Sequence, residues 1–406
     1  MENPSRPALT TVLAASNIVS ALGFTTDEAF DNVRQGRTGL HLLSDRFDLP
    51  EPFMASEIDG ARLDDAFARL QPPTLTDGAY TRFEQAAIVS AADALRLSGL
   101  DPANPRVRFI LSTTKGNVHL LDPRETVGHS PKQLYLWHTA NRIARFFGNT
   151  TPTLVVSNAC ISGAAALIAA RRELLADRCD PLADRCDAAV VIGADMLSRF
   201  VVSGFQSFKA LSAAPCRPFD AERSGLNLGE AAATIILTRR AAKDLRPSDA
   251  VLTDGAIRND ANHISGPSRT GEGCFRALRH ILRDIPAERL TNEIAFINAH
   301  GTATPYNDEM ESIALTRAGL DRVPVNSLKG YFGHTLGAAG VLETILAVHA
   351  LRAGIVLPTA GFRTSGVTHP IRIADSTSPV TARRCVKMLS GFGGCNAVLL
   401  LSLHAD

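Results

Sequence analysis

The chain has 406 residues, 45% of them hydrophobic, and a formal net charge of +1, which argues against disorder and against overall attraction to nucleic acid or membrane. None of its seven cysteines has metal-binding spacing, and neither an 18-residue apolar run nor a clear secretory signal occurs. We therefore expect a cytoplasmic protein with no membrane span, no nucleic-acid partner and no metal site.

In residues 1–245 the hydrophobic pattern predicts alternating strands and helices. Strands are expected at 9–23, 107–114, 153–157, 188–194 and 231–240, and helices at 26–36, 80–98, 132–147 and 161–176. The helix at 80–98 should stop at Gly99. Residues 40–78, interrupted by Pro and Asp, give no assignment. Asp-Arg-Cys-Asp occurs at 177–180 and again at 184–187, which fits a solvated loop better than a metal site.

Residues 246–406 repeat the alternation. Strands are expected at 251–257, 293–298 and 323–327, helices at 271–283, 308–318 and 335–353, and two further strands around a glycine-rich turn between Val386 and Leu403. Repeated β–α alternation predicts stacked α/β layers. No long linker separates 1–245 from 246–406, so we expect two halves in one compact body.

One motif occurs in both halves. When Cys160 is placed on His334, the Gly-Ala-Ala triplets at 163–165 and 337–339 coincide. Each copy has a β-rich run, a turn and an Ala-rich helix, which suggests two half-domains that share one active site. A helix N-terminus should lower the pKa of the Cys160 thiol and supply N–H donors to an acyl oxygen. It should also keep the His334 ring neutral.

Other polar residues stand next to glycines. His300 follows a predicted strand in His-Gly-Thr-Ala-Thr-Pro, and the carboxyl end of a strand is a usual ligand position in α/β proteins. Lys329 and Glu343 flank His334, and both could be surface charges. A lysine in a Gly/Ser loop could instead position that loop.

The segment 390–396 holds three glycines and reads either as a tight turn or as a hairpin against a ligand, with Phe392 as a movable plug. A thiol, two imidazoles and such a hairpin imply a covalent acyl thioester. Two histidines suit a second half-reaction, in which an enolate oxygen is stabilised without protonation of carbon. A cysteine hydrolase is less favoured, because no acidic orienter for either histidine is evident.

These motifs resemble the two-histidine β-ketoacyl-[acyl-carrier-protein] synthases, condensing enzymes of the thiolase-like superfamily. Five ordered segments carry the resemblance, namely 159–164, 218–230, 298–305, 327–340 and 391–396. The resemblance implies an α/β thiolase-like fold with five layers, αβαβα, built from two pseudo-symmetric halves. It assigns the nucleophilic cysteine to 1–245 and both catalytic histidines to 246–406.

The resemblance also implies a role for each matching residue. Cys160 would carry the acyl group, while His300 and His334 would stabilise the enolate formed when malonyl-carrier protein loses CO₂. Lys329 would be the active-site lysine and Glu343 its ion partner. Phe392 would be a gate whose N–H joins that of Cys160 in an oxyanion hole. Thr302 and Thr304 would contact phosphopantetheine, Phe205 would line the acyl pocket, and Asp308 and Glu230 would give structural support.

The implied reaction is a decarboxylative Claisen condensation that yields 3-oxoacyl-acyl-carrier protein. The implied partners are acyl-carrier protein and a second copy of the chain, with a heterodimer as the alternative. No cofactor is implied beyond the phosphopantetheine of the carrier protein.

The chain departs from the family pattern at three places, Ala231, Leu328–Tyr331 and Cys395. These departures leave open the acyl chain preference and the pathway, either fatty acid or specialised polyene and polyketide synthesis. A non-catalytic chain-length subunit is disfavoured because Cys160, His300 and His334 are all present. A thiolase, with Cys395 as its second cysteine, is disfavoured by His334 and the His-Gly-Thr loop.

Overall fold

The computed structural model describes residues 9–72, 77–176 and 186–405, and the ten strands of its large sheet fall into two sets of five. The first set is β1 (Leu9–Ser20), β4 (Val107–Ser112), β5 (Leu154–Val156), β6 (Ala188–Asp195) and β8 (Ala231–Ala241). The second set is β9 (Ala250–Asn259), β10 (Phe296–Asn298), β11 (Val325–Asn326), β14 (Arg384–Gly391) and β15 (Cys395–Leu403).

The two sets have the same topology. Their orders are β1-β8-β6-β4-β5 and β9-β15-β14-β10-β11, and in each the first two pairings are antiparallel and the last two parallel. One pairing between Val12 and Val251 joins them along β1 and β9. The repeated motif in the sequence thus corresponds to a repeated sheet. We propose a boundary between 1–245 and 246–406, in the connection from β8 to β9.

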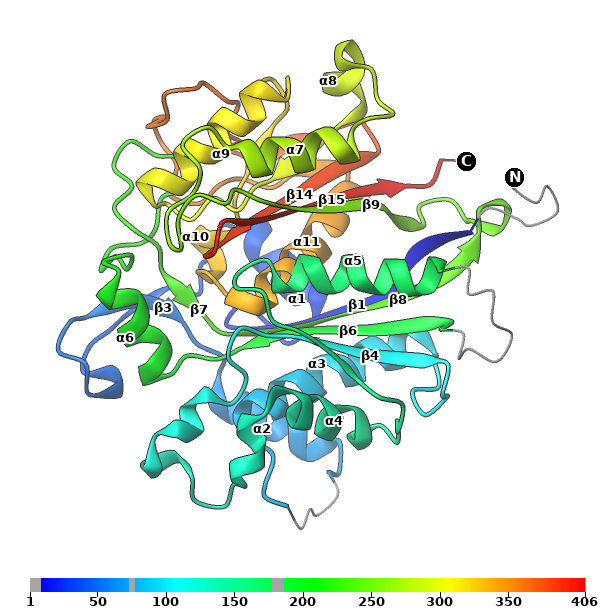
Figure 1. Ribbon diagram of the computed structural model, residues 1–406, viewed down its shortest axis with the longest axis vertical. Helices are drawn as coiled ribbons and strands as arrows, with labels where there is room; N and C mark the ends of the chain where they lie inside the picture. The colour runs from blue at the N-terminus through cyan, green and yellow to red at the C-terminus, as the bar shows by residue number, and fades with distance from the viewer. Residues whose placement is uncertain (1–8, 73–76, 177–185, 406) are drawn as a thin grey trace.

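Helices form three layers around the two sheets, as Figure 1 shows. Helix α3 (Arg82–Ser98) covers the outer face of the first sheet, and α7 (Glu272–Ile281), with α9 (Pro305–Arg317) against it, covers that of the second. Between the sheets lie α5 (Ser162–Leu175) and α11 (Ala339–Arg352), which contact strands of both. The predicted αβαβα layering is therefore confirmed.

The middle layer is buried on every side. In α11, 12 of 14 residues are buried, which explains why apolar residues surround this helix instead of forming one stripe. The exception is Glu343, a buried charge that requires partners. Helices α5 and α11 approach closely because Gly163 and Gly340 lie against each other. A Cβ added to Gly163 would be only 2.8 Å from the Cα of Gly340, so no larger residue fits there without a shift.

Most predicted elements agree with the structure to within a few residues. Helix α3 begins with a capping box between Thr81 and Glu84 and ends at Gly99, whose left-handed conformation (φ 65°) explains the predicted stop. Segment 40–78, which gave no assignment, contains β2 (His41–Leu43), β3 (Phe53–Ser56) and α2 (Gly60–Arg69). The sequence also missed α6 (Arg199–Ser207) and β7 (Leu228–Gly229), the parallel partner of β3.

The other elements are short or peripheral. They are α1 (Thr26–Arg34), α4 (Leu136–Phe146), α8 (Leu290–Glu293), α10 (Lys329–Phe332), β12 (Ile355–Val356), β13 (Ser378–Pro379) and 3-10 turns at Arg46–Asp48, Val118–Leu121, Pro123–Glu125, Pro131–Leu134, Ala242–Asp244, Ala287–Arg289 and Leu336–Ala338. The Asp-Arg-Cys-Asp repeat lies largely outside the described residues. Within the described ranges, no helix has the length and apolar character needed to cross a membrane.

Candidate active site

Cys160 lies in a tight turn between β5 and α5. The residue before it, Ala159, has a left-handed conformation (φ 44°), which is strained for a residue with a side chain. Ser162 fixes the turn, because its hydroxyl donates to the Ala159 carbonyl (2.6 Å) and accepts from the Asn158 amide (2.8 Å). A rigid turn thus presents the buried thiol two residues before α5 begins.

His300 follows β10 in a loop that two buried carboxyl groups hold. The N–H groups of His300 and Gly301 each donate to Glu311 over 2.7 Å, and the Thr302 N–H donates to Asp308 over 3.0 Å. Burial raises the pKa of Glu311 to about 7 and that of Asp308 to about 6. Both acids lie on α9, so this helix fixes the backbone of the histidine loop.

His334 is held by residues from the first half of the chain. Its N–H donates to the Asn227 carbonyl (2.7 Å), and its carbonyl accepts from the Gly229 N–H (3.1 Å). Its Nδ1 accepts from the Leu336 N–H (3.3 Å), so a neutral ring carries its proton on Nε2. This buried Nε2 has no hydrogen-bond partner among the described residues. The ring therefore offers a free N–H donor.

The thiol and the two imidazoles meet at one point. The Cys160 Sγ and one ring nitrogen from each of His300 and His334 all lie within 4.8 Å of one another. The two rings cross at 82° with their centroids 5.0 Å apart. All three residues line a cavity of about 550 Å³, together with Thr302 and Thr304, whose hydroxyls are 2.9 Å apart.

Burial dominates the electrostatics of these three groups. It raises the pKa of the Cys160 thiol to about 11, although the charge of Lys329 and a hydrogen bond from the Phe392 backbone act in the opposite direction. The prediction that the helix end lowers this pKa is therefore wrong in net direction. Burial also holds the pKa of His300 and His334 well below the usual value, so the predicted neutral His334 is confirmed, with burial as its main cause.

A buried ion cluster lies beside the histidines. Lys329 Nζ is 2.5 Å from Glu343 Oε1, and Lys387 Nζ forms an ion pair with the other carboxylate oxygen. All three side chains are at most 3% exposed, so Lys329 and Glu343 are not the surface charges that the sequence left open. Cys160, His300 and His334 are spaced closely enough to hold a metal ion, but two adjacent ammonium groups oppose a divalent cation there.

Three aromatic rings also line the cavity. The Phe392 ring lies between Phe205 and Phe208, with centroids at 5.8 and 5.4 Å. All three rings line the cavity, and Phe205 and Phe208 come from α6 and its C-terminal end. The hairpin that carries Phe392 approaches Cys160 closely, since a Cβ on Gly391 would be 3.1 Å from the Cys160 nitrogen. Glycine at 391 therefore permits this contact.

Glu230 lies away from the thiol. It accepts hydrogen bonds from the N–H groups of Ile58 and Leu197, both at 3.0 Å, and burial raises its pKa to about 7. It borders a larger cavity of about 1050 Å³ whose lining includes none of Cys160, His300 and His334. Glu230 thus connects the loops after β3 and β6.

Comparison with known sequences identifies the chain. Residues 12–243 match the family described as beta-ketoacyl synthase, N-terminal domain, and residues 249–363 match beta-ketoacyl synthase, C-terminal domain. The chain belongs to the β-ketoacyl synthase family. It is therefore a condensing acyltransferase with a thiolase-like fold, as its resemblance implied.

The names of several relatives refer to polyketide synthesis or to nodulation. The tetracenomycin polyketide synthase ketoacyl synthase alpha subunit of Streptomyces glaucescens is 31% identical over 94% of each chain. Nodulation protein E of Rhizobium leguminosarum bv. trifolii is 31% identical over 78% of this chain and 81% of its own. A solved complex of a ketosynthase (ApeO) with its chain length factor (ApeC) from Xenorhabdus doucetiae contains a chain with 26% identity, full coverage of both chains and a TM-score of 0.84.

Sequence reasoning missed three residues of the synthase site. The first is Glu311, which follows His300 by 11 residues. Its position three residues after Asp308 on the same helix could have indicated that both acids face the histidine loop. Phe208 follows Phe205 by three residues, the spacing of one helical turn. Lys387 gave no signal, because it lies within a predicted apolar strand and its partners come from distant segments.

Proposed function

We propose that this synthase catalyses the decarboxylative Claisen condensation of an acyl thioester with malonyl-acyl-carrier protein, giving 3-oxoacyl-acyl-carrier protein. The observation that carries the proposal is the convergence of the buried Cys160 Sγ with the buried rings of His300 and His334 in one cavity. The family membership supports it.

In the first half-reaction the Cys160 sulfur attacks the acyl thioester carbonyl. A new carbon–sulfur bond forms, the bond to the phosphopantetheine sulfur breaks, and the thiol proton ends on the departing thiol. The backbone N–H groups of Cys160 and Phe392 are suited to stabilise the tetrahedral oxyanion, since the first lies in the turn that holds the thiol and the second, on the facing hairpin, donates to the thiol sulfur. Thr302 and Thr304 line the route along which the phosphopantetheine arm would enter.

In the second half-reaction the malonyl group loses CO₂, and the electrons of the broken bond form an enolate. A neutral imidazole can donate to the enolate oxygen without delivering a proton to carbon, and His334 has a free Nε2–H for this purpose. The enolate carbon then attacks the acyl group on Cys160. A carbon–carbon bond forms, the bond from the acyl carbon to the Cys160 sulfur breaks, and the thiolate takes up from water the one proton that the overall reaction consumes.

Acyl-carrier protein would supply both substrates on phosphopantetheine, and no other cofactor takes part in the scheme. We propose that the chain works as a dimer in the cytoplasm. Two solved structures that it resembles are complexes of a ketosynthase with a chain length factor, so a heterodimer is the main alternative to a homodimer. For the same reason a non-catalytic chain-length role is the second candidate function, and it predicts that Cys160 is never acylated.

The test uses a panel of acyl-carrier proteins and intact-mass measurement. The wild-type chain should gain the mass of one acyl group, and Cys160→Ala should gain none, because the sulfur forms the bond. His300→Ala should still be acylated but should lose condensation by about 10²–10³-fold, as expected when a donor to a developing oxyanion is removed.

Cys274→Ala is the matched control, because this cysteine is a buried residue of α7 and does not line the cavity. It should be acylated and should condense as the wild type does. A wild-type chain that never forms an adduct, alone or with candidate partner chains, would favour the non-catalytic role. Condensation at the wild-type rate in His300→Ala would refute the role of His300.

A further inference from the structure

Lys387 is a second buried lysine beneath the site, and the scheme above gives it no role. It lies on β14 beside Asn298 of β10 and has no exposed surface. Its ammonium donates to the carbonyls of Met388 (2.8 Å), Ala299 (3.2 Å) and Asn298 (3.4 Å) and pairs with Glu343. Two of these carbonyls belong to the residues directly before His300.

The lysine changes the charge of the buried cluster. Lys329 and Glu343 alone would form a neutral pair, whereas protonated Lys387, whose pKa burial lowers to about 8, leaves one positive charge in excess at neutral pH. The charged or titratable groups around it are Glu343 on α11, Lys329 on α10, Glu311 on α9 and the rings of His300 and His334. Glu311 is a weak counter-charge near neutral pH, because burial raises its pKa to about 7.

We propose that Lys387 is a positioning residue for the condensation, which fixes the backbone before His300 and supplies the positive charge that keeps both imidazoles neutral. This inference rests on the proposed function. Coulomb repulsion from Lys387 and Lys329 adds to burial in lowering the pKa of His300 and His334. A net positive cluster also favours the enolate, whose negative charge develops in a site of low dielectric constant.

The test measures CO₂ release from malonyl-carrier protein against pH. Lys387→Met removes the charge and the donors, and Lys387→Gln removes the charge but keeps an N–H₂ donor. In both, kcat at neutral pH should fall by about tenfold, and the acid limb of the kcat profile should move up by about one pH unit, because loss of a like charge raises the histidine pKa. KM should change little. If kcat falls further in Lys387→Met than in Lys387→Gln, the difference measures how much the hydrogen bonds from Lys387 to the backbone before His300 contribute.

A charge-restoring variant separates electrostatics from packing. In Glu343→Gln/Lys387→Met the cluster regains a single positive charge on Lys329, so the acid limb should return towards the wild-type pH. Lys243→Met, in the 3-10 turn Ala242–Asp244, is the control and should match the wild type.

The outcomes distinguish this inference from the proposed function. A wild-type chain that neither releases CO₂ nor forms product would refute the proposed function itself. A wild type that does both, with Lys387→Met and Lys387→Gln showing an unshifted acid limb, would overturn only the role of Lys387. If the Met variant does not fold, as judged by its thermal melt, the Gln variant alone decides.

Discussion

At the scale of single residues, the surroundings of Cys160 shift the pKa of its thiol in opposite directions. Its sulfur is buried, which favours the neutral thiol and raises the pKa to about 11. Lys329 and the Phe392 backbone favour the thiolate, but less strongly. The resting enzyme should therefore hold a thiol at neutral pH, and the nucleophile should form when substrate arrives rather than before.

The rate of alkylation by iodoacetamide measures this state directly, because only the thiolate reacts. We expect the rate at Cys160, followed by mass spectrometry of its peptide, to rise about tenfold for each pH unit between 7 and 9, since the thiolate fraction grows in that proportion below the pKa. Cys160→Ala gives the background rate. A rate that stays constant over this range would mean that the thiol pKa lies below 7, as the helix position alone predicts.

The residues of the site differ in how far the sequence reveals them. Cys160, His300 and His334 are predictable because each stands among glycines and small residues in a turn or loop, so local context marks them as exceptional. The sign of the Cys160 pKa shift was not predictable, because it depends on how deeply the folded chain covers the sulfur. Lys387 is a third case, since a buried lysine is recognised only when Glu343 and the carbonyls of β10 are placed around it.

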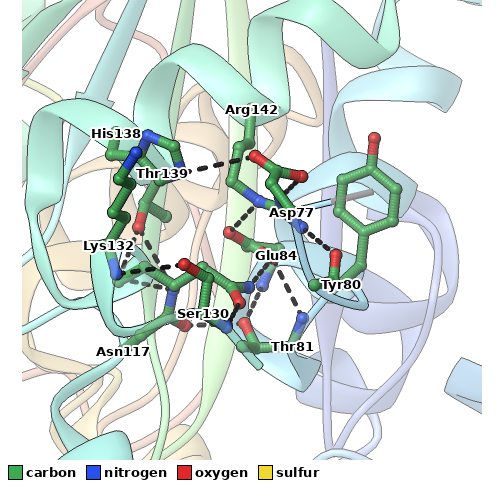
Figure 2. A network of polar contacts seen from close by, with 12 residues as sticks. Asp77, Tyr80, Thr81, Glu84, Asn117, Ser130, Lys132, His138, Thr139 and Arg142 are labelled. Atoms are coloured by element: carbon green, nitrogen blue, oxygen red, sulfur yellow. Dashed lines mark hydrogen bonds and ion pairs between the residues drawn. The ribbon is translucent and has the colours of Figure 1, made fainter. Parts of the chain in front are cut away.

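At the scale of elements, a polar network joins α3 and α4 to the segment between β4 and α4 (Figure 2). Arg142 of α4 contacts Glu84 of α3 (3.0 Å) and Asp77 (2.5 Å), and Gln133 donates to the second Glu84 oxygen (3.0 Å). Asn117 continues the network to the Gln133 carbonyl (3.0 Å). Arg142 and Glu84 are at most 3% exposed, so their charges depend on each other.

Removal of Arg142 should therefore destabilise the fold strongly. Arg142→Met leaves the Glu84 carboxyl buried without its cation, and we expect the unfolding free energy to fall by about 3–5 kcal/mol in a urea titration. Arg96→Met is the matched control, because the pair Arg96–Asp93 lies on the same helix α3 but its side chains are 70% and 36% exposed. It should cost about 0.5 kcal/mol or less. Equal losses in both variants would show that the buried pair adds no stability.

Two of the strands that the sequence failed to predict, β3 and β7, share a physical cause. Strand β3 pairs with β7, more than 170 residues further along the chain, and neither strand is longer than four residues. Such short segments have too little periodicity to signal a strand, and the hydrogen bonds that define them come from remote partners. Long α3, in contrast, carries its periodicity, cap and stop within its own residues.

At the scale of the whole molecule, the two halves meet where α5 crosses α11. Gly163 is the second residue of α5 and Gly340 the second residue of α11, and their close approach sets the distance between the turn of Cys160 and the loop of His334. Gly163 of the first triplet therefore has a structural reason, because a small residue there lets two buried helices pack closely between two sheets, whereas Gly337 of the second triplet packs against the backbone of Thr113. The sequence predicted the duplication and the layers, while the pairing of Gly163 with Gly340 required the structure.

Gly340→Ala should expose this dependence. A Cβ at Gly340 would lie 2.7 Å from the Gly163 carbonyl carbon and closer still to the Ala164 nitrogen, and backbone atoms cannot yield as a flexible side chain does. Alanine gains about 0.5–1 kcal/mol over glycine within a helix, but overpacking costs about 1–3 kcal/mol, so the net effect should lower the melting temperature. Gly204→Ala in α6 is the control, because nothing lies within 4 Å of its added Cβ, and it should melt at the wild-type temperature or above.

Gly340→Ala should also lose activity. At a temperature where the variant is still folded, its condensation rate should fall by up to about 10²-fold, because a shift of about 1 Å between Cys160 and His334 is enough for such a loss. A Gly340→Ala enzyme that melts and condenses as the wild type does would mean that the middle layer absorbs the methyl group and that this crossing does not set the geometry of the site.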